Sequence, residues 1–277
     1  MSSDALPVYV IHYRSPEWCR KTVASLRNSD VPLDITVINN GGDLDQMDVQ
    51  VVDAPGNVGY AGAANIAIAI RPDAPLIVIT SHDVDVAPGA MRRLLEAARA
   101  YPDAAVLGAN VGSGGKTELG RSDDVAWLEW TSGTCLLIRR ACLDEIGNFD
   151  ARLHSYCEDV DLGRRANDAG WRVGKVARAR ATERGSSMGS SYARRLIRAN
   201  WLLLDFKRMG WPGLFQAATA QALLSAKIAG WAISHPADAR KQIPIAWDNF
   251  AALFIALRRL PAFIRTRPLN RPGFVGG

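Results

Sequence analysis

The chain has 277 residues, of which 48% are hydrophobic and 22% charged. This balance suits one large folded domain with an appendage and excludes wholesale disorder, collagen and coiled coil. The four cysteines, at positions 19, 135, 142 and 157, form no CxxC pair, so we expect no disulfide scaffold or zinc ribbon, and a reducing cytosol fits best. The N-terminal residues lack a basic start and a long apolar stretch, so no signal peptide is expected.

The first half of the chain alternates short apolar runs with helical patterns. We expect strands at 8–13, 34–40, 49–54, 76–80 and 105–111, and helices at 16–26, 61–70 and 88–101. Such alternation predicts an α/β fold with a mostly parallel sheet and helices on both faces. In these sheets ligands bind at the carboxyl ends of the strands.

The second half ends in a helical region. We expect a strand at 127–140, a helix at 162–169 and a strand at 171–179, followed by helices at 192–209, 214–233 and 245–264. The net charge changes with the pattern. Residues 1–185 hold 20 Lys and Arg against 25 Asp and Glu, whereas residues 186–277 hold 13 against 3. A basic tail after a mildly acidic body indicates a polyanion or an anionic membrane surface as its partner.

Residues 213–233 have the length of a membrane span, but Gln216, Gln221 and Lys227 lie among them. A central Lys costs about 2.5–3.5 kcal/mol on insertion, so a position in the membrane interface is favoured over a crossing. The last helix fits this picture, because apolar residues recur in it at near-helical spacing beside arginines: Phe254, Leu257, Leu260 and Phe263, with Arg258, Arg259, Arg265, Arg267 and Arg271. The alternative is a soluble helical subdomain with a solvated basic face.

Two acidic clusters stand where the predicted sheet would hold ligands. Asp83 and Asp85 follow the strand at 76–80, a position where carboxylates often bind Mg²⁺ or Mn²⁺ beside phosphates. Glu158, Asp159 and Asp161 stand directly before a predicted helix. Crowding raises the pKa of such carboxylates and a helix N-terminus lowers it, so one of them could remain ionised yet basic enough to accept a proton. The alternative for the first pair is a loop in which Asp85 is solvated or caps the next helix. For the second cluster, spacing alone favours helix capping and function equally.

A glycine-rich turn, NVGYAGAAN at 57–65, leads into a predicted helix. Helix N-termini preceded by glycine can cradle phosphate. However, the turn is neither GxGxxG nor a P-loop, and it does not follow the first strand. Close packing of helix on sheet would explain the small residues equally well.

The order of these motifs resembles the large inverting family of GT-A glycosyltransferases that use nucleotide sugars, and most closely its bacterial rhamnosyltransferase-like branch. The resemblance covers about residues 7–208. It rests on these segments: VYVIHYRSPEWCRKTVASL, ITVINNGG, NVGYAGAAN, VITSHDVDVAPGAM and WTSGTCLLIRRACLDEIGNFDARLHSYCEDVDLGRRANDAGWRV.

The resemblance implies a nucleotide-sugar site formed by residues that follow the strands of the first half. These residues are Tyr13, Arg14, Asn39, Asn40, Asn57, Gly59, Asn65, Ser81, His82 and Asp83. Asn39 stands where the family usually has an acid that contacts the nucleotide. Ser81 stands where many relatives have the first Asp or an Asn of the metal motif.

The resemblance also implies the catalytic, acceptor and metal residues. Asp159 matches the general base, and Glu158 beside it is an orienting carboxylate. The acceptor side of the cleft comprises Trp130, Ser132, Gly133 and Asp161. For the Mn²⁺ or Mg²⁺ ion, the candidates are Asp83, Asp85 and Glu183, with Asp83 favoured over Asp85. Glu183 replaces the family's usual His, and a contribution from His82 is the alternative.

By the same resemblance, residues 1–190 would form a GT-A catalytic domain. Its nucleotide-binding half would be residues 1–111 and its acceptor half residues 112–190, and residues 191–277 would add basic amphipathic helices that dock on a membrane. The implied enzyme is an inverting, metal-dependent hexosyltransferase of bacterial cell-envelope glycan synthesis. It would use a dTDP- or UDP-linked donor and a glycan or lipid-diphosphate-linked acceptor, in the cytoplasm on the inner face of the cell membrane.

Three other functions are alternatives to this one. A Rossmann oxidoreductase should have GxGxxG after its first strand, and VYVIHYRSPEW contains no glycine. Nucleic acid is not expected as a partner, because the basic residues are spread among apolar helical positions. A catalytically silent nucleotide-sugar-binding or scaffold protein of the same fold is the remaining alternative.

Overall fold

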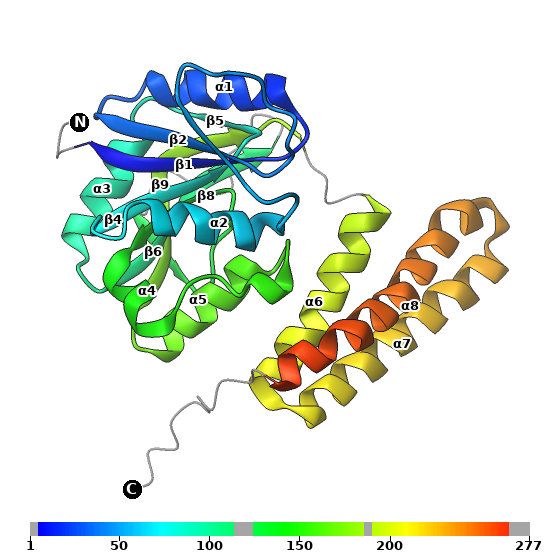
Figure 1. The fold of residues 1–277 in the computed structure, drawn as a ribbon. Coiled ribbons are helices and arrows are strands. Elements are labelled where there is room, and N and C mark those ends of the chain that lie inside the picture. The colour runs from blue at the N-terminus through cyan, green and yellow to red at the C-terminus, as the bar shows by residue number, and fades with distance from the viewer. Residues whose placement is uncertain (1–4, 114–123, 186–189, 266–277) are drawn as a thin grey trace, which may run out of the picture. The chain divides into compact units, whose positions relative to one another are not determined.

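The computed structural model describes residues 5–113, 124–185 and 190–265, and its chain packs as two compact units (Figure 1). The first unit comprises Met1–His154 and Glu158–Gly185. The second comprises Ser155–Cys157 and Ser186–Gly277. A short stretch before Glu158 therefore packs with the C-terminal helices, although the chain on both sides of it belongs to the first unit.

The first unit is built on a nine-stranded mixed sheet with the order β3-β2-β1-β4-β8-β6-β9-β5, in which β7 pairs with β9. The strands are β1 (Leu6–His12), β2 (Leu33–Asn39), β3 (Gln50–Asp53), β4 (Leu76–Ser81), β5 (Val84–Val86), β6 (Ala104–Ser113), β7 (Val125–Leu128), β8 (Cys135–Arg139) and β9 (Arg172–Glu183). Among the described strands, β3, β2, β1 and β4 are mutually parallel, as predicted. The other half is mixed, because β8 is antiparallel to β4 and β6, while β5 and β7 are antiparallel to β9.

Helices cover both faces of the sheet, which confirms the predicted α/β class. Alternate residues of β1 explain the two layers. Val8 and Val10 lie in one core with α1 (Pro16–Arg27) and α3 (Ala90–Ala100). Tyr9 and Ile11 lie in the other core with α2 (Gly59–Ile70), α4 (Arg140–Ile146) and α5 (Glu158–Asp168). A strand that alternates between two cores must be apolar on both sides, as this strand is.

The segment predicted as one strand over 127–140 is divided in the structure. It contains the end of β7, a loop, and β8, after which α4 begins at Arg140. The sequence WTSGT in the middle lacks a continuous apolar run, so the chain can leave the sheet there and present Ser132 and Gly133 in a loop. The short strand β5 and the helix α4 were not predicted.

The second unit contains three long helices, α6 (Ser191–Met209), α7 (Trp211–Ser234) and α8 (Pro236–Arg265), each of which packs against the other two. Apolar residues such as Leu203 and Phe263 form its interior. Ion pairs also join the helices. Arg194 and Arg195 of α6 pair with the buried Asp248 of α8 at 2.8 and 2.6 Å.

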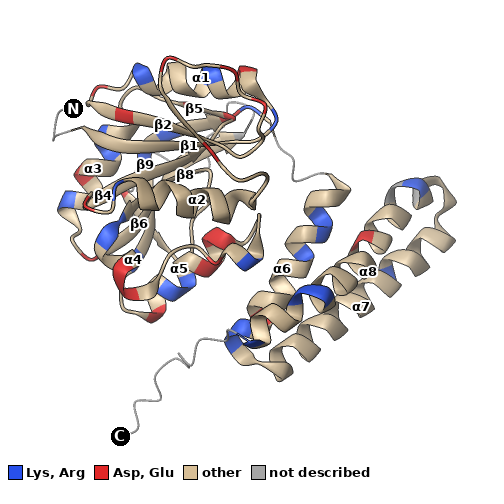
Figure 2. Cartoon of the chain, viewed as in Figure 1, with Lys and Arg blue, Asp and Glu red and all other residues tan. Residues whose placement is uncertain are grey.

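Much of the apolar surface of this unit is exposed. Of the sixteen large hydrophobic side chains exposed among the described residues, fourteen lie on α6, α7 and α8. Of the four apolar residues predicted to face a membrane on the last helix, Phe254 and Leu257 are exposed, whereas Leu260 and Phe263 are buried. Figure 2 shows that Lys and Arg outnumber acidic residues on these helices. In the described part of the chain, no helix is long and apolar enough to cross a membrane. Arg267 and Arg271 lie outside the described residues.

Candidate active site

The candidate site lies at the carboxyl ends of β1, β2 and β4, which reach the same edge of the sheet because the strands are parallel. The adjacent strand β8 runs in the opposite direction, so its first residues meet the end of β4. The Ser81 N–H donates to the Thr134 carbonyl at 2.9 Å. This contact brings the loop that contains Gly133 beside the segment that contains Asp83.

The turn that enters α2 is fixed by asparagine side chains. Buried Asn40 accepts a hydrogen bond from the Val58 N–H at 2.9 Å and donates to Asn57 Oδ1 at 3.3 Å. Asn57 Oδ1 also accepts from the Gly59 N–H at 3.0 Å. Gly59 has a φ of +75°, and a Cβ there would collide with the His154 carbonyl. The glycine is therefore required both by the turn and by the close approach of the chain before α5.

Asp159 is held by two backbone donors near the start of α5. The Gly133 N–H donates to its Oδ2 and the Val160 N–H to its Oδ1, both at 2.8 Å. Burial raises the pKa of Asp159 above its ordinary value, and these two N–H groups partly oppose the rise because they stabilise the ionised form. Asp159 therefore combines a raised pKa with a fixed orientation.

Glu158 differs from its neighbour in its surroundings. Its side chain is buried, and its Oε2 has no hydrogen-bond partner among the described residues. Burial, and then the charge of Asp159, raise the pKa of Glu158 well above its ordinary value. Because Asp159 accepts an N–H on each carboxylate oxygen whereas the Oε2 of Glu158 has no partner among the described residues, we assign the negative charge of the pair to Asp159 and the proton to Glu158.

Tyr60 connects the two sides of the site, a role that its place in the glycine-rich turn does not predict. Its hydroxyl donates to the Gly133 carbonyl at 2.5 Å. Burial raises the pKa of the Tyr60 phenol well above its ordinary value, and the nearby carboxylates of Asp159 and Asp83 raise it further. Both predicted acidic centres are therefore close enough to act on one phenol.

Asp83 and Glu183 form the most suitable pair of carboxylates for a cation. Burial raises the pKa of Asp83. Burial, and then the charge of Asp83, raise that of Glu183 to about 6. A divalent cation would relieve this crowding of hard oxygen ligands, so the two residues fit a Mg²⁺ or Mn²⁺ ion. Asp85 instead lies 3.2 Å from the Arg184 guanidinium. The described residues contain no group of three or more His, Cys, Asp or Glu side chains arranged to hold a metal ion.

His82 packs its ring edge against His12, with the ring centroids 5.4 Å apart. Burial lowers the pKa of His82, and the charge of Asp83 opposes this. His12 in turn forms a hydrogen bond with Asp43 at 2.8 Å. At the end of β1, the Arg14 guanidinium lies 5.2 Å from the centre of the Tyr13 ring. These side chains follow β1 and β4, where the nucleotide was predicted.

Two further predicted nucleotide contacts, Asn39 and Asn65, are engaged within the protein as Asn40 and Asn57 are. Asn39 donates to Asp53 at 2.7 Å and accepts from the Gly42 N–H at 3.0 Å. The Asn65 amide bonds both the carbonyl and the N–H of Phe149, at 2.9 and 3.0 Å. Both asparagines therefore hold loops around the site.

The predicted acceptor residues differ in exposure. Trp130 is partly exposed, and Ser132 shares a hydrogen bond with Thr134 at 2.8 Å. Asp161 is buried and pairs with Arg165 at 2.8 Å, so in this structure it supports α5.

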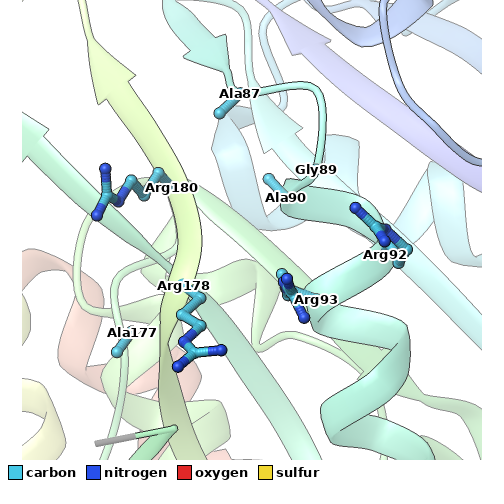
Figure 3. A pocket seen from close by; sticks show the side chains of 8 residues that line it. All are labelled: Ala87, Gly89, Ala90, Arg92, Arg93, Ala177, Arg178 and Arg180. Carbon is cyan, nitrogen blue, oxygen red and sulfur yellow. The ribbon is translucent and has the colours of Figure 1, made fainter. Parts of the chain in front are cut away.

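A separate cavity of about 460 Å³ lies between the β5–α3 turn and β9. Figure 3 shows four arginines around it, with small residues between them: Arg92, Arg93, Arg178 and Arg180, with Ala87, Gly89, Ala90 and Ala177. Arg92 pairs with Asp30 at 2.7 Å and Arg93 with Glu96 at 2.8 Å. This cavity shares no residue with the site around Asp83 and Asp159.

Comparisons with known proteins found a matching family model and a curated relative. The family described as "Glycosyltransferase like family 2" matches residues 120–200. The chain is 28% identical to the N-acetylglucosaminyl-diphospho-decaprenol L-rhamnosyltransferase of Mycobacterium tuberculosis, over 61% of this chain and 72% of that protein.

Two solved structures have the same fold. One is the mannosyltransferase PcManGT of Pyrobaculum calidifontis in complex with GDP-Man and Mn²⁺. It has a TM-score of 0.59 and 16% identity, over 93% of this chain and 88% of that one. The other is S. aureus TarS, with a TM-score of 0.52 and 15% identity, over 72% of this chain but 40% of TarS.

The sheet and these structural neighbours show that the chain has the GT-A fold. Its sequence is similar to that of a rhamnosyltransferase, and residues 120–200 match the glycosyltransferase family model.

Proposed function

We propose that this protein is an inverting glycosyltransferase that moves a sugar, rhamnose in the first instance, from a nucleotide-diphospho-sugar to a hydroxyl of a lipid-linked or polysaccharide acceptor. The reaction would serve bacterial cell-envelope glycan synthesis. The observation that carries this proposal is the pair formed by an oriented Asp159 and a buried Glu158, close to Asp83.

Asp159 acts as the general base. A neutral alcohol is a weak nucleophile at pH 7, so its proton must leave as the bond to the anomeric carbon forms. The raised pKa of Asp159 brings its basicity closer to that of an effective base, while the Gly133 and Val160 N–H groups keep the carboxylate in one orientation. A single displacement of the diphosphate by the acceptor oxygen inverts the anomeric centre and needs no covalent intermediate on the enzyme.

Asp83 and Glu183 would hold a divalent cation, Mn²⁺ or Mg²⁺. The backbone supports this assignment, because the Arg184 N–H donates to the Asp83 carbonyl at 2.8 Å and Glu183 pairs with Val84 in the sheet. The charge of Asp83 also helps to raise the pKa of Glu183. When bound, such an ion stabilises negative charge on the departing diphosphate. His82, which precedes Asp83 in the chain, is the alternative second ligand.

The donor and acceptor classes are taken from relatives. The mycobacterial relative is named as a rhamnosyltransferase that acts on a decaprenol-linked acceptor, and PcManGT was solved with a nucleotide-diphospho-sugar. For this chain we propose a dTDP- or UDP-linked donor and an acceptor carried on a lipid diphosphate. Residues 1–190 would form the catalytic domain, with its nucleotide half at 1–111 and its acceptor half at 112–190.

The C-terminal helices, within residues 191–277, would dock on the anionic inner face of the cell membrane. On α8, Trp247, Phe250, Phe254 and Leu257 recur at intervals of three or four residues, which places them on one face of the helix. All four are exposed. Arg258 stands next to this stripe. An exposed apolar stripe beside basic residues is the pattern of a helix that lies in a membrane interface.

A transfer assay tests the proposed function. Purified protein is incubated with labelled dTDP-rhamnose or UDP-sugars and a polyprenyl-diphospho-N-acetylglucosamine acceptor, with EDTA or with added Mn²⁺. We expect a glycolipid product only with the metal. Donor binding without transfer or hydrolysis in any combination would favour the catalytically silent alternative.

A further inference from the structure

The loop that leads into α5 has an unusual backbone. His154, Tyr156 and Cys157 have φ values of 63°, 68° and 66°, in the left-handed region that L-residues other than glycine rarely occupy. Such conformations persist only where their surroundings hold them, and they concentrate at functional sites. This loop ends at Glu158, directly before Asp159.

Two anchors hold the loop. At its first residue, the His154 carbonyl accepts a hydrogen bond from the Ala61 N–H in α2 at 2.9 Å. The next three residues, Ser155–Cys157, pack with the helical unit. There the side-chain amide of Asn200 on α6 donates to the Ser155 carbonyl at 2.9 Å and to the Tyr156 carbonyl at 2.7 Å.

Asn200 is itself fixed. It is fully buried, with 0% of its surface exposed. The Arg259 guanidinium on α8 donates to its Oδ1 at 2.7 Å. This bond leaves the amide NH₂ group turned towards the loop, so both of its hydrogens serve the two carbonyls. One buried side chain therefore links two helices of the second unit to the loop before the catalytic acids.

We propose that Asn200 is a positioning residue for Asp159. By holding two consecutive carbonyls in a strained loop, it fixes the backbone from which Glu158 and Asp159 extend. This inference rests on the proposed role of Asp159 as the general base. It gives the helical unit a part in catalysis that is separate from membrane docking.

The test replaces Asn200 with Ala in the full-length protein and measures transfer to a short, soluble acceptor, so that membrane binding plays no part. Displacement of a catalytic group by about 1 Å can cost on the order of a hundredfold in rate. We therefore expect Asn200→Ala to lower kcat by about ten- to a hundredfold, with the KM for the donor unchanged. The acidic limb of the pH–kcat profile should move to higher pH, because a displaced Asp159 loses N–H donors that favour its ionised form.

Gln221→Ala is the matched control. Gln221 is a buried amide of the same unit, and it donates to the Asn249 carbonyl at 2.6 Å. Its loss should lower the melting temperature to a similar extent but leave kcat and the pH profile unchanged. Asn200→Asp keeps the shape of the side chain but loses the donors, so it should fail as Asn200→Ala does.

An unchanged kcat in Asn200→Ala, or an equal loss of kcat in Gln221→Ala, would overturn the positioning role. Asp159→Asn, measured in parallel, separates this result from a failure of the proposed function. If Asp159→Asn is fully active, the base assignment fails and the inference fails with it. If Asp159→Asn is inactive while Asn200→Ala is normal, only the positioning role is lost.

Discussion

Replacement of Asp159 by Asn removes the proposed base while the side chain keeps its size. Asp159 accepts one N–H on each carboxylate oxygen, from Gly133 and from Val160. Asn has a single acceptor oxygen, so its NH₂ group must face one of these donors. The unsatisfied N–H should cost about 1–3 kcal/mol of stability. Loss of a general base typically costs about 10²–10⁴ in rate, which corresponds to about 3–5 kcal/mol of activation free energy.

We therefore expect Asp159→Asn to fold, to bind the donor as the wild type does, and to turn over at least about a hundredfold more slowly. Turnover is measured at saturating donor and acceptor, and donor binding is followed by thermal shift. Asp168→Asn, an exposed position on the same helix, serves as the control and should retain full activity. Near-normal turnover in Asp159→Asn would refute the base assignment. A loss of donor binding in that variant would place Asp159 in the nucleotide site instead.

Three further changes test the surroundings of the base and the docking helix. The raised pKa of Glu158 means that the folded state retains a proton which the unfolded state releases near 4.5, so stability should fall as the pH rises from there through the folded pKa. Glu158→Gln should lessen this fall in urea titrations across the same pH range, and an unchanged slope would show that Glu158 ionises normally. Tyr60→Phe removes the hydrogen bond to Gly133 and should lower stability by about 1–3 kcal/mol. It should also reduce kcat without changing the KM for the donor. A normal kcat would limit the role of Tyr60 to packing. The double change Trp247→Ser and Phe254→Ser should weaken flotation with anionic vesicles at least tenfold, since each large apolar side chain contributes about 1.5–3 kcal/mol when fully buried; undiminished flotation would exclude α8 as the docking helix.

Hydrophobic pattern alone predicted most elements of the first unit. The strand expected at 8–13 is β1 at Leu6–His12, and the helix expected at 61–70 is α2 at Gly59–Ile70. These segments are long, apolar and bounded by Gly, Pro or Asn, so local signals agree with the tertiary structure. The three C-terminal helices were also predicted, but α8 begins at Pro236 rather than at residue 245, because Pro244 lies inside the helix and does not end it.

The direction of β8 and the division of 127–140 could not be predicted in this way. Strand direction depends on which neighbour a strand pairs with, and β8 pairs with β4, more than fifty residues earlier in the chain. Tyr60 and Asn200 were missed for a related reason. Each donates to backbone carbonyls of residues far away in the sequence. Every residue has such a carbonyl, so residue types cannot show which one accepts the bond.

The stereochemistry of the product tests the central claim most directly. The anomeric configuration of the newly formed linkage is determined by NMR and compared with that of the donor sugar. A single displacement assisted by Asp159 predicts a fully inverted centre, with no sugar bound covalently to the enzyme at any time. A retained configuration would contradict this mechanism, because it requires two successive displacements or attack from the face of the leaving group.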